Sequence, residues 1–199
     1  MSLIVAVIGS PFEDDYSVKL ADTVLDGSMG LSTNLIERYT LRKLKFVHGF
    51  DPEVNVEDDL TPIIYTIGRA DCVVFSTPVI FKGVSAQMKL LIDRLRCFLD
   101  EEGRPKSDQT RKAIIVVSSE NSMDEAKDVS KRMESSLSEV GFETVGTILC
   151  DSSAGEDMPV LMATARSLGL ELRNNKRPDQ NLGGTGMHSV VGSNATPTQ

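Results

Sequence analysis

The sequence predicts an α/β fold, a three-layer sandwich in which a five-stranded parallel sheet lies between helices. Two observations favour this fold. Short apolar runs without helical periodicity alternate along the chain with segments in which apolar residues recur every three or four positions. The runs are apolar on both alternating faces, which is typical of parallel strands that helices cover on both sides. Alternation at this spacing indicates βαβ units with right-handed crossovers.

Five segments are the expected strands. Four are continuous apolar runs, whereas 33–39 places Leu35 and Ile36 between polar residues, a pattern that suits the edge of a sheet. In chain order, we expect strands at 3–8, 33–39, 71–76, 113–118 and 143–150.

Five helices are expected around these strands. The clearest lies at 84–98, where Met88, Leu91 and Leu95 belong to an apolar stripe with helical spacing. In chain order, we expect helices at 18–25, 60–67, 84–98, 126–140 and 161–172. The polar stretch 100–111 is expected to be a surface loop.

A single domain is expected over 1–173, followed by a flexible or extended tail over 174–199. The tail holds four glycines, two prolines and few large apolar residues, too few to offset the entropy lost on ordering. The alternative is an arm that docks on a partner subunit.

Composition and charge exclude several functions. The 199 residues include 21 basic and 29 acidic side chains, a net charge of -8, so a basic face for nucleic acid or for an anionic membrane is not expected. No apolar run approaches the roughly 20 residues that span a bilayer, and no secretory signal is recognised, so we expect a cytoplasmic protein. The three cysteines lie far apart, which indicates buried thiols rather than disulfides or a metal site: Cys72, Cys97 and Cys150.

Ligands of open parallel sheets bind beyond the carboxyl ends of the strands, where the strand order reverses. The loops expected there are 9–17, 76–85 and 118–123. The first precedes a helix whose free N–H groups suit a phosphate, and Ser10 and Ser17 are candidate hydroxyl donors to it. The alternative is structural, with Ser17 as the N-cap of the helix and Pro11 as a turn residue.

The second loop places apolar residues at the same edge. Pro78 ends the strand, Gly83 permits a bend or a close approach, and Ser85 helps to start the next helix. The apolar residues between them predict either a surface for a flat hydrophobic ligand or partner subunit, or side chains folded back into the core. These residues are Val79, Ile80 and Phe81.

Residues 76–94 resemble the segment S-P-V-Y-x-G-x-x-x-x-x-L-K-x-[FL]-[IL]-D-R of the NADPH-dependent FMN reductase and iron–sulfur flavoprotein family, with Ile80 at its Tyr position and Met88 at its Leu position. Residues 8–11 and Ser17 resemble the phosphate loop of the same family, G-S-P-R-x-x-[GS]-[NS]-[ST]. The resemblance covers about residues 1–150, most strongly 70–95. It implies a flavodoxin-like fold with strand order 2-1-3-4-5.

The resemblance also implies FMN as cofactor and NAD(P)H as co-substrate. Ser10 and Ser17 in the first loop would bind the FMN phosphate, and the second and third loops would line the flavin ring. The implied ring contacts are Pro78, Val79, Ile80, Phe81, Gly83, Ser118, Ser119 and Asn121. Because the cofactor carries the chemistry, neither a catalytic side chain nor a metal site is expected.

Three departures from the family pattern bear on this cofactor. Phe12 replaces the basic residue after Gly-Ser-Pro, and the acids Glu13, Asp14 and Asp15 follow it. Their charges would weaken phosphate binding unless they face solvent or cap the helix at Asp14 or Asp15. Ile80 removes an aromatic ring, and the absence of cysteine from 44–50 argues against an iron–sulfur cluster.

Two other features have ordinary interpretations. His48 is expected to be a surface or packing residue rather than a catalytic base. The acidic run 53–59 is expected to be a solvated loop that provides a helix cap at Asp58 or Asp59.

The favoured function is an FMN-binding oxidoreductase that passes electrons from NAD(P)H through FMN to a small acceptor, a quinone or a flavin, within a homodimer or homotetramer. The alternative is a flavodoxin-like protein that has lost FMN and acts as a binding or assembly module. A third possibility is a flavodoxin-like enzyme with a different phosphorylated ligand.

Overall fold

The computed structural model describes residues 2–29, 34–47, 58–153 and 158–174. Five parallel strands form one sheet in the order β2-β1-β3-β4-β5, which confirms the flavodoxin-like order. The chain passes from β1 to β2 on one side and crosses to β3 on the other, so the reversal of strand order lies between β1 and β3. The strands are β1 (Leu3–Ile8), β2 (Leu35–Thr40), β3 (Cys72–Pro78), β4 (Arg111–Ser119) and β5 (Phe142–Asp151).

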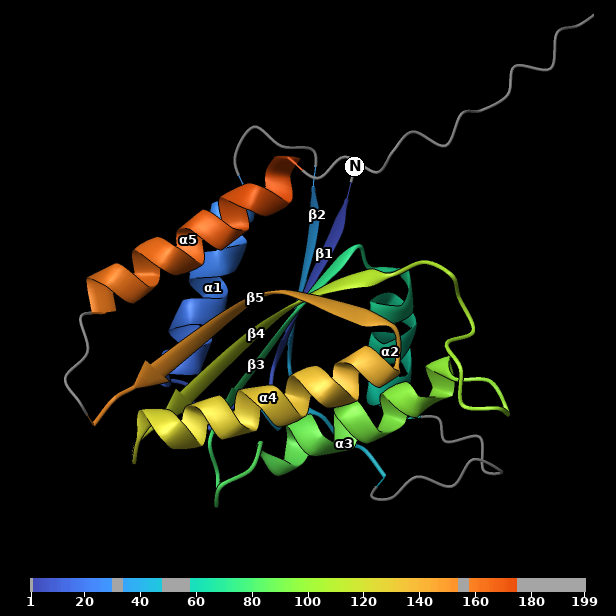
Figure 1. The fold of residues 1–199 in the computed structure, drawn as a ribbon, viewed down its shortest axis with the longest axis horizontal. Helices are drawn as coiled ribbons and strands as arrows, with labels where there is room; N and C mark the ends of the chain where they lie inside the picture. The colour runs from blue at the N-terminus through green and yellow to red at the C-terminus, as the bar shows by residue number, and fades with distance from the viewer. Residues whose placement is uncertain (1, 30–33, 48–57, 154–157, 175–199) are drawn as a thin grey trace, which may run out of the picture.

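Helices cover both faces of the sheet. Figure 1 shows α1 and α5 together on one face, with α2, α3 and α4 on the other. The helices are α1 (Tyr16–Ser28), α2 (Leu60–Arg69), α3 (Ala86–Arg94), α4 (Met123–Glu139) and α5 (Met158–Asn174), with 3₁₀ turns η1 (Leu41–Lys43) and η2 (Leu95–Phe98). The expected three-layer sandwich is confirmed.

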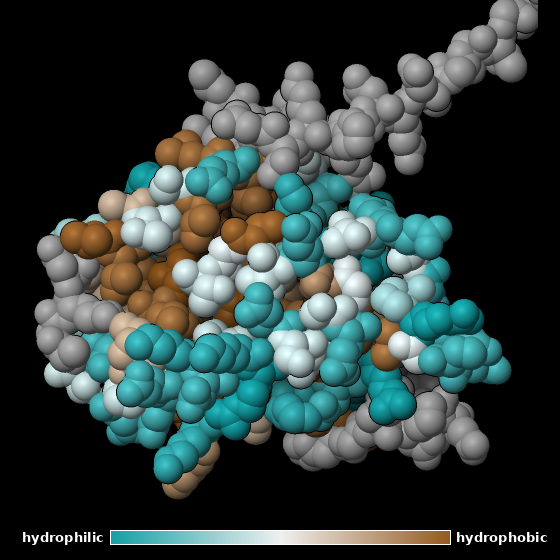
Figure 2. Space-filling view, viewed as in Figure 1, coloured by the Kyte–Doolittle hydropathy of each residue, from teal (hydrophilic) through white to brown (hydrophobic). Residues whose placement is uncertain are grey.

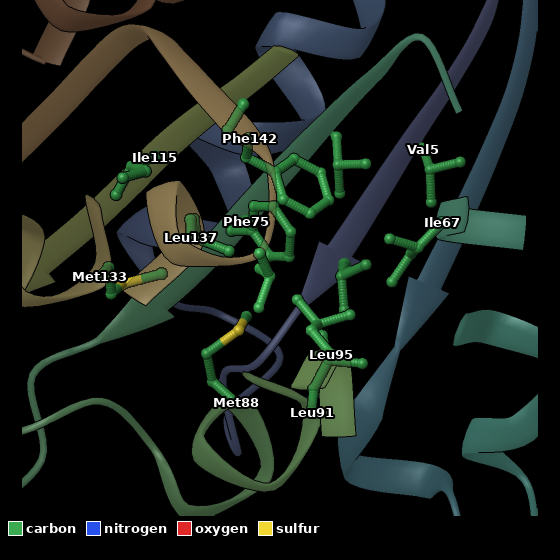
Figure 3. Packing of buried hydrophobic residues seen from close by; sticks show 14 of the residues in the cluster. Val5, Ile67, Phe75, Met88, Leu91, Leu95, Ile115, Met133, Leu137 and Phe142 are labelled. Carbon is green, nitrogen blue, oxygen red and sulfur yellow. The ribbon is translucent and has the colours of Figure 1, made fainter. Parts of the chain in front are cut away.

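Two hydrophobic cores lie on opposite faces of the sheet, because alternate residues of each buried strand point to opposite sides. On the face of α2, α3 and α4, Phe75 of β3 packs edge to face against Phe142 of β5, with ring centroids 5.5 Å apart. Met88 of α3 reaches toward the same cluster (Figure 3). The sheet is therefore clamped between helices, and its carboxyl edge is held rigidly.

The contact between α1 and α5 depends on glycine. A Cβ atom on Gly169 of α5 would lie 2.1 Å from the carbonyl oxygen of Val24 in α1, and one on Gly27 would lie 2.4 Å from the carbonyl oxygen of Arg166. Both contacts involve backbone atoms, so the two helices approach more closely than any larger residue would allow.

Three expectations need correction. The helix expected at 84–98 starts at Ala86 and tightens into a 3₁₀ turn from Leu95. This turn directs Cys97 outward, so its thiol is exposed rather than buried. The surface loop ends at 110, because Arg111 begins β4 and is buried; its guanidinium donates to the carbonyl oxygen of Gly68 and lies over the ring of Phe98. His48 and the tail residues 175–199 lie outside the described residues.

The surface is uneven in character. Figure 2 shows hydrophobic surface where Figure 1 places α5 and β5, next to the polar surface of α4. Val145 of β5 and Val160 and Leu170 of α5 are exposed hydrophobic residues. Within the described ranges, no helix has the length and apolar character needed to cross a membrane.

Candidate functional site

Three loops meet at the carboxyl edge of the sheet, beyond the ends of β1, β3 and β4. The backbone N–H of Gly9 donates to the carbonyl oxygen of Ser76 at 2.7 Å, which joins the first loop to the second. The N–H of Val79 donates to the carbonyl oxygen of Ser118 at 2.7 Å, which joins the second to the third. These bonds hold the three predicted loops together as one surface.

The first of these contacts requires a glycine. A Cβ atom on Gly9 would lie 2.9 Å from the Cβ of Met88 and 3.1 Å from the carbonyl oxygen of Ser76. The loop after β1 therefore passes directly against α3, and glycine at position 9 is needed for this path.

Asp15 caps helix α1 and gathers hydroxyl groups around its carboxylate. Its Oδ1 atom accepts a hydrogen bond from the N–H of Ser17 at 2.7 Å and another from the hydroxyl of Ser17. The hydroxyl of Ser118, at the end of β4, donates to the same oxygen at 3.0 Å. Of the caps considered, Asp15 is confirmed and Ser17 is wrong, because Ser17 lies buried inside the first turn.

Ser10 has a different position. It is buried, and its Oγ accepts the N–H of Phe12 at 3.1 Å, which shapes the turn of the first loop. The side chain of Phe12 remains 58% exposed. The structure places Ser10 and Ser17 in the same loop, but only Ser17 contacts the Asp15 carboxylate.

The other two acids of the loop have basic partners. Asp14 pairs with Lys19 at 2.5 Å, and this hydrogen bond raises the pKa of Lys19. Glu13 pairs with Arg42, and the ammonium of Lys43 lies 3.8 Å away. These bases lie outside the loop, in α1 and η1, so the sequence of the loop alone does not reveal them.

A signal for two of these bases was present in the sequence. Arg42 and Lys43 directly follow β2, and strand order 2-1-3 places the end of β2 beside the end of β1. Basic residues in the loop after β2 are therefore expected to reach the acids in the loop after β1.

The second loop forms a tight two-residue turn. Ile80 and Gly83 exchange backbone hydrogen bonds of 2.8 and 3.0 Å, and the two residues between them, Phe81 and Lys82, have positive φ angles of 46° and 61°. Positive φ at both central residues defines a turn that normally contains Asn-Gly.

The position of Phe81 decides between the two interpretations of this loop. Its side chain is completely exposed, so it does not fold back, whereas Val79 is half-buried and packs against the core. The guanidinium of Arg132 in α4 donates to the carbonyl oxygen of Lys82 at 2.7 Å, which fixes the turn. An exposed aromatic ring is thus held on a supported but conformationally unfavourable backbone, a combination found at ligand sites.

The third loop is ordered by its own hydrogen bonds. The Oγ of Ser119 accepts the N–H groups of Asn121 and Ser122 at 3.2 and 3.3 Å. The amide of Asn121 donates to Glu125 at 3.0 Å, on the exposed side of the loop. Ser118 and Ser119 are buried, so the contacts expected between this loop and a flavin ring remain predictions.

The residues present fit the two ends of FMN unequally. The apolar turn at Phe81 offers ring surface, with Ile80 and Gly83 half-exposed beside it and Pro78 buried below. At the phosphate end, the donors of Ser17 already bind the Asp15 carboxylate, and Ser118, which the family resemblance placed at the flavin ring, donates to the same oxygen. The turn thus offers apolar surface for a flavin ring, whereas the helix N-terminus is open to a phosphate only after the Asp15 side chain moves away.

Comparisons with known proteins agree with this fold. The chain matches the family described as NADPH-dependent FMN reductase over residues 2–155. No curated protein matches its sequence significantly.

Solved structures share the fold at low sequence identity. The NAD(P)H:quinone oxidoreductase from Methanothermobacter marburgensis superposes with a TM-score of 0.68 at 19% identity, over 86% of this chain and 98% of that one. An FMN-dependent NADH-azoreductase from Bacillus anthracis, in complex with FMN, also gives a TM-score of 0.68, at 14% identity over 87% of this chain and 100% of that one. The apo form of an NADH:FMN oxidoreductase gives 0.63 at 17% identity, over 88% of this chain and 92% of that one.

Proposed function

Because this chain belongs to the NADPH-dependent FMN reductase family, whose members bind FMN and use NAD(P)H as co-substrate, we propose that it passes electrons from NAD(P)H to a small organic acceptor, a quinone or a free flavin. The chemistry that bound FMN would supply is acceptance of the hydride from NAD(P)H and transfer of its electrons to the acceptor. The protein positions the flavin and leaves one side of it open to the second substrate.

The observation that carries the proposal is the turn at Phe81 and Lys82. A fully exposed aromatic ring in a conformation disfavoured for its residue type persists only where surrounding contacts hold it, here the hydrogen bond from Arg132. The turn lies directly after β3, beside the reversal of strand order where ligands of such sheets bind.

The chain's own residues have defined tasks in this proposal. Phe81, Ile80 and Gly83 would meet the flavin ring, together with the third loop. Helix α1 would direct its N-terminal N–H groups toward the phosphate. No side-chain acid or base is needed, because the flavin would carry the chemistry.

We also propose a homodimer or homotetramer in the cytoplasm. The apolar second loop supports the assembly, because the half-exposed Ile80 and the exposed Phe81 form adjoining apolar surface that a second subunit can cover. Light scattering measures the assembly state directly.

Flavin titration followed by NAD(P)H oxidation tests the function. FMN is titrated into the protein, and NADH and NADPH oxidation is followed with a quinone or riboflavin as acceptor. Phe81→Ala is expected to weaken flavin binding by about tenfold, the effect of losing one aromatic ring contact. Tyr65→Ala is the matched control, since Tyr65 is an aromatic residue of α2, 67% exposed and outside the three loops. Absence of flavin binding would overturn the proposal and favour the alternative, a flavodoxin-like binding or assembly module.

A further inference from the structure

The carboxylate of Asp15 occupies the donors that a bound phosphate needs. Three hydrogen bonds converge on its Oδ1 atom, from the N–H of Ser17, the hydroxyl of Ser17 and the hydroxyl of Ser118. Two of these donors belong to α1 and the third to the end of β4, so the carboxylate sits between the first and third loops. Its position matches that of an anion bound at the start of a helix.

Asp15 differs from its two acidic neighbours in what compensates its charge. Glu13 and Asp14 are exposed and pair with Arg42 and Lys19 respectively. Within the described part of the chain, Asp15 forms no ion pair, and the partners seen at Oδ1 are neutral donors. Lys19 interacts electrostatically with Asp15 without forming an ion pair with it. The carboxylate therefore lies at the helix N-terminus, where it competes with any other anion.

We infer that Asp15 is a specificity-determining residue that disfavours the phosphorylated end of a flavin. FMN must displace this carboxylate before its phosphate can reach Ser17 and Ser118, whereas riboflavin carries no phosphate and leaves the Asp15 contacts in place. This inference rests on the proposed function and identifies the ligand class of the same site. FMN then binds in exchange with solution rather than as a permanently held group.

The size of the effect follows from the charges. Repulsion between unit charges 4 Å apart corresponds to about fivefold in a binding constant in water, and the effect grows at a half-buried site and with a phosphate that carries nearly two charges. Removing the Asp15 charge is therefore expected to tighten FMN binding by at least about tenfold.

Four proteins and two ligands form the test. Dissociation constants for FMN and riboflavin are measured by quenching of flavin fluorescence with the unaltered chain and with Asp15→Asn, Asp15→Gly and Asp14→Asn. Asparagine and glycine are both good N-caps, so α1 is retained, and glycine removes the side chain altogether. Asp14→Asn is the matched control, because it removes the same charge from the neighbouring residue, whose side chain is 87% exposed.

The expected result is a change in the ratio of the two dissociation constants. In both Asp15 variants, FMN binds at least about tenfold more tightly while riboflavin changes by less than about threefold. In Asp14→Asn, both ligands stay within about threefold of the unaltered chain. Circular dichroism confirms that each variant is folded.

Three other results would overturn the inference. If both flavins bind but neither Asp15 variant changes the ratio, the inference fails and the proposed function stands. If Asp14→Asn tightens FMN as much as Asp15→Asn, the effect is one of general charge and Asp15 has no special position. If neither flavin binds any of the four proteins, the proposed function fails together with the inference.

Discussion

The turn at Phe81 and Lys82 combines an unfavourable backbone with an exposed aromatic ring, and mutation can separate the two. Both residues have positive φ, a region that disfavours residues other than glycine by about 1–2 kcal/mol each. We predict that the double substitution Phe81→Asn and Lys82→Gly, which installs the pair preferred by this turn, stabilises the protein. Little burial is lost, because Phe81 is completely exposed.

The expected gain follows from three contributions. Removing the backbone strain at both positions would stabilise the protein by about 2–4 kcal/mol. Asparagine at position 81 recovers only part of its share. The larger entropy of glycine in the unfolded chain offsets about 0.5–1 kcal/mol. The net increase in the free energy of unfolding is about 1–2 kcal/mol, or about 2–8 °C in Tm for a chain of this length.

Urea unfolding followed by far-ultraviolet circular dichroism measures this gain, since the chain has no tryptophan to report by fluorescence. The hydrogen bond from Arg132 to the carbonyl oxygen of residue 82 survives the substitution, so the turn stays anchored. Phe81→Ala is the control, because it removes the ring and retains the positive φ. Phe81→Ala should bind flavin more weakly and should not be more stable. The double variant should bind flavin more weakly and should also be more stable. An unchanged or lower free energy of unfolding in the double variant would refute the reasoning that the turn is strained.

Other predictions concern packing, charge and thiol reactivity. Gly169→Ala should lower the free energy of unfolding by about 1–3 kcal/mol in urea, because its methyl group meets the backbone oxygen of Val24. Arg94→Met should lower it by about 3–5 kcal/mol, because it leaves the buried carboxylate of Asp58 without its ion-pair partner at 2.7 Å. Burial raises the pKa of Asp58, but hydrogen bonds from Arg94 and from two backbone N–H groups outweigh it, so the pKa lies below 3.8. The stability from this pair is therefore present above that value and lost as the pH falls below it, a decline in Tm that Arg94→Met should reduce. Burial raises the pKa of Cys72 to about 12, so a thiolate-specific reagent at neutral pH should label it only after unfolding, as mass spectrometry can check.

Most of the fold could be predicted from local pattern. The buried strands β1, β3 and β4 are continuous apolar runs, and a run of this kind has few other stable environments. The helix at 84–98 shows the limit. Its apolar spacing is compatible with both α-helical and 3₁₀ turns, so the change at Leu95 and the outward position of Cys97 could not be read from periodicity.

The three loops expected to form the site lie side by side in the structure, whereas the assignment of a site to them stays a prediction. The rule that ligands bind at the carboxyl edge identified all three loops, and the structure joins them by backbone hydrogen bonds. The capping bond itself is local, but one further contact of the Asp15 carboxylate is contained in no local pattern. Ser118, whose hydroxyl meets the carboxylate of Asp15, lies 103 residues along the chain.

The acidic run after Gly-Ser-Pro shows why charge must be counted with its partners in space. Counted along the sequence, Glu13, Asp14 and Asp15 place three negative charges beside a phosphate site. In the structure, two of them face bases supplied by η1 and α1, and these pairs lie at the surface, where water screens what remains. The third faces neutral donors at the helix N-terminus, where its charge acts at short range and with less screening. Asp15 is therefore the acid of the run that we expect to act most strongly on an incoming phosphate, so the position of each acid matters as well as their number.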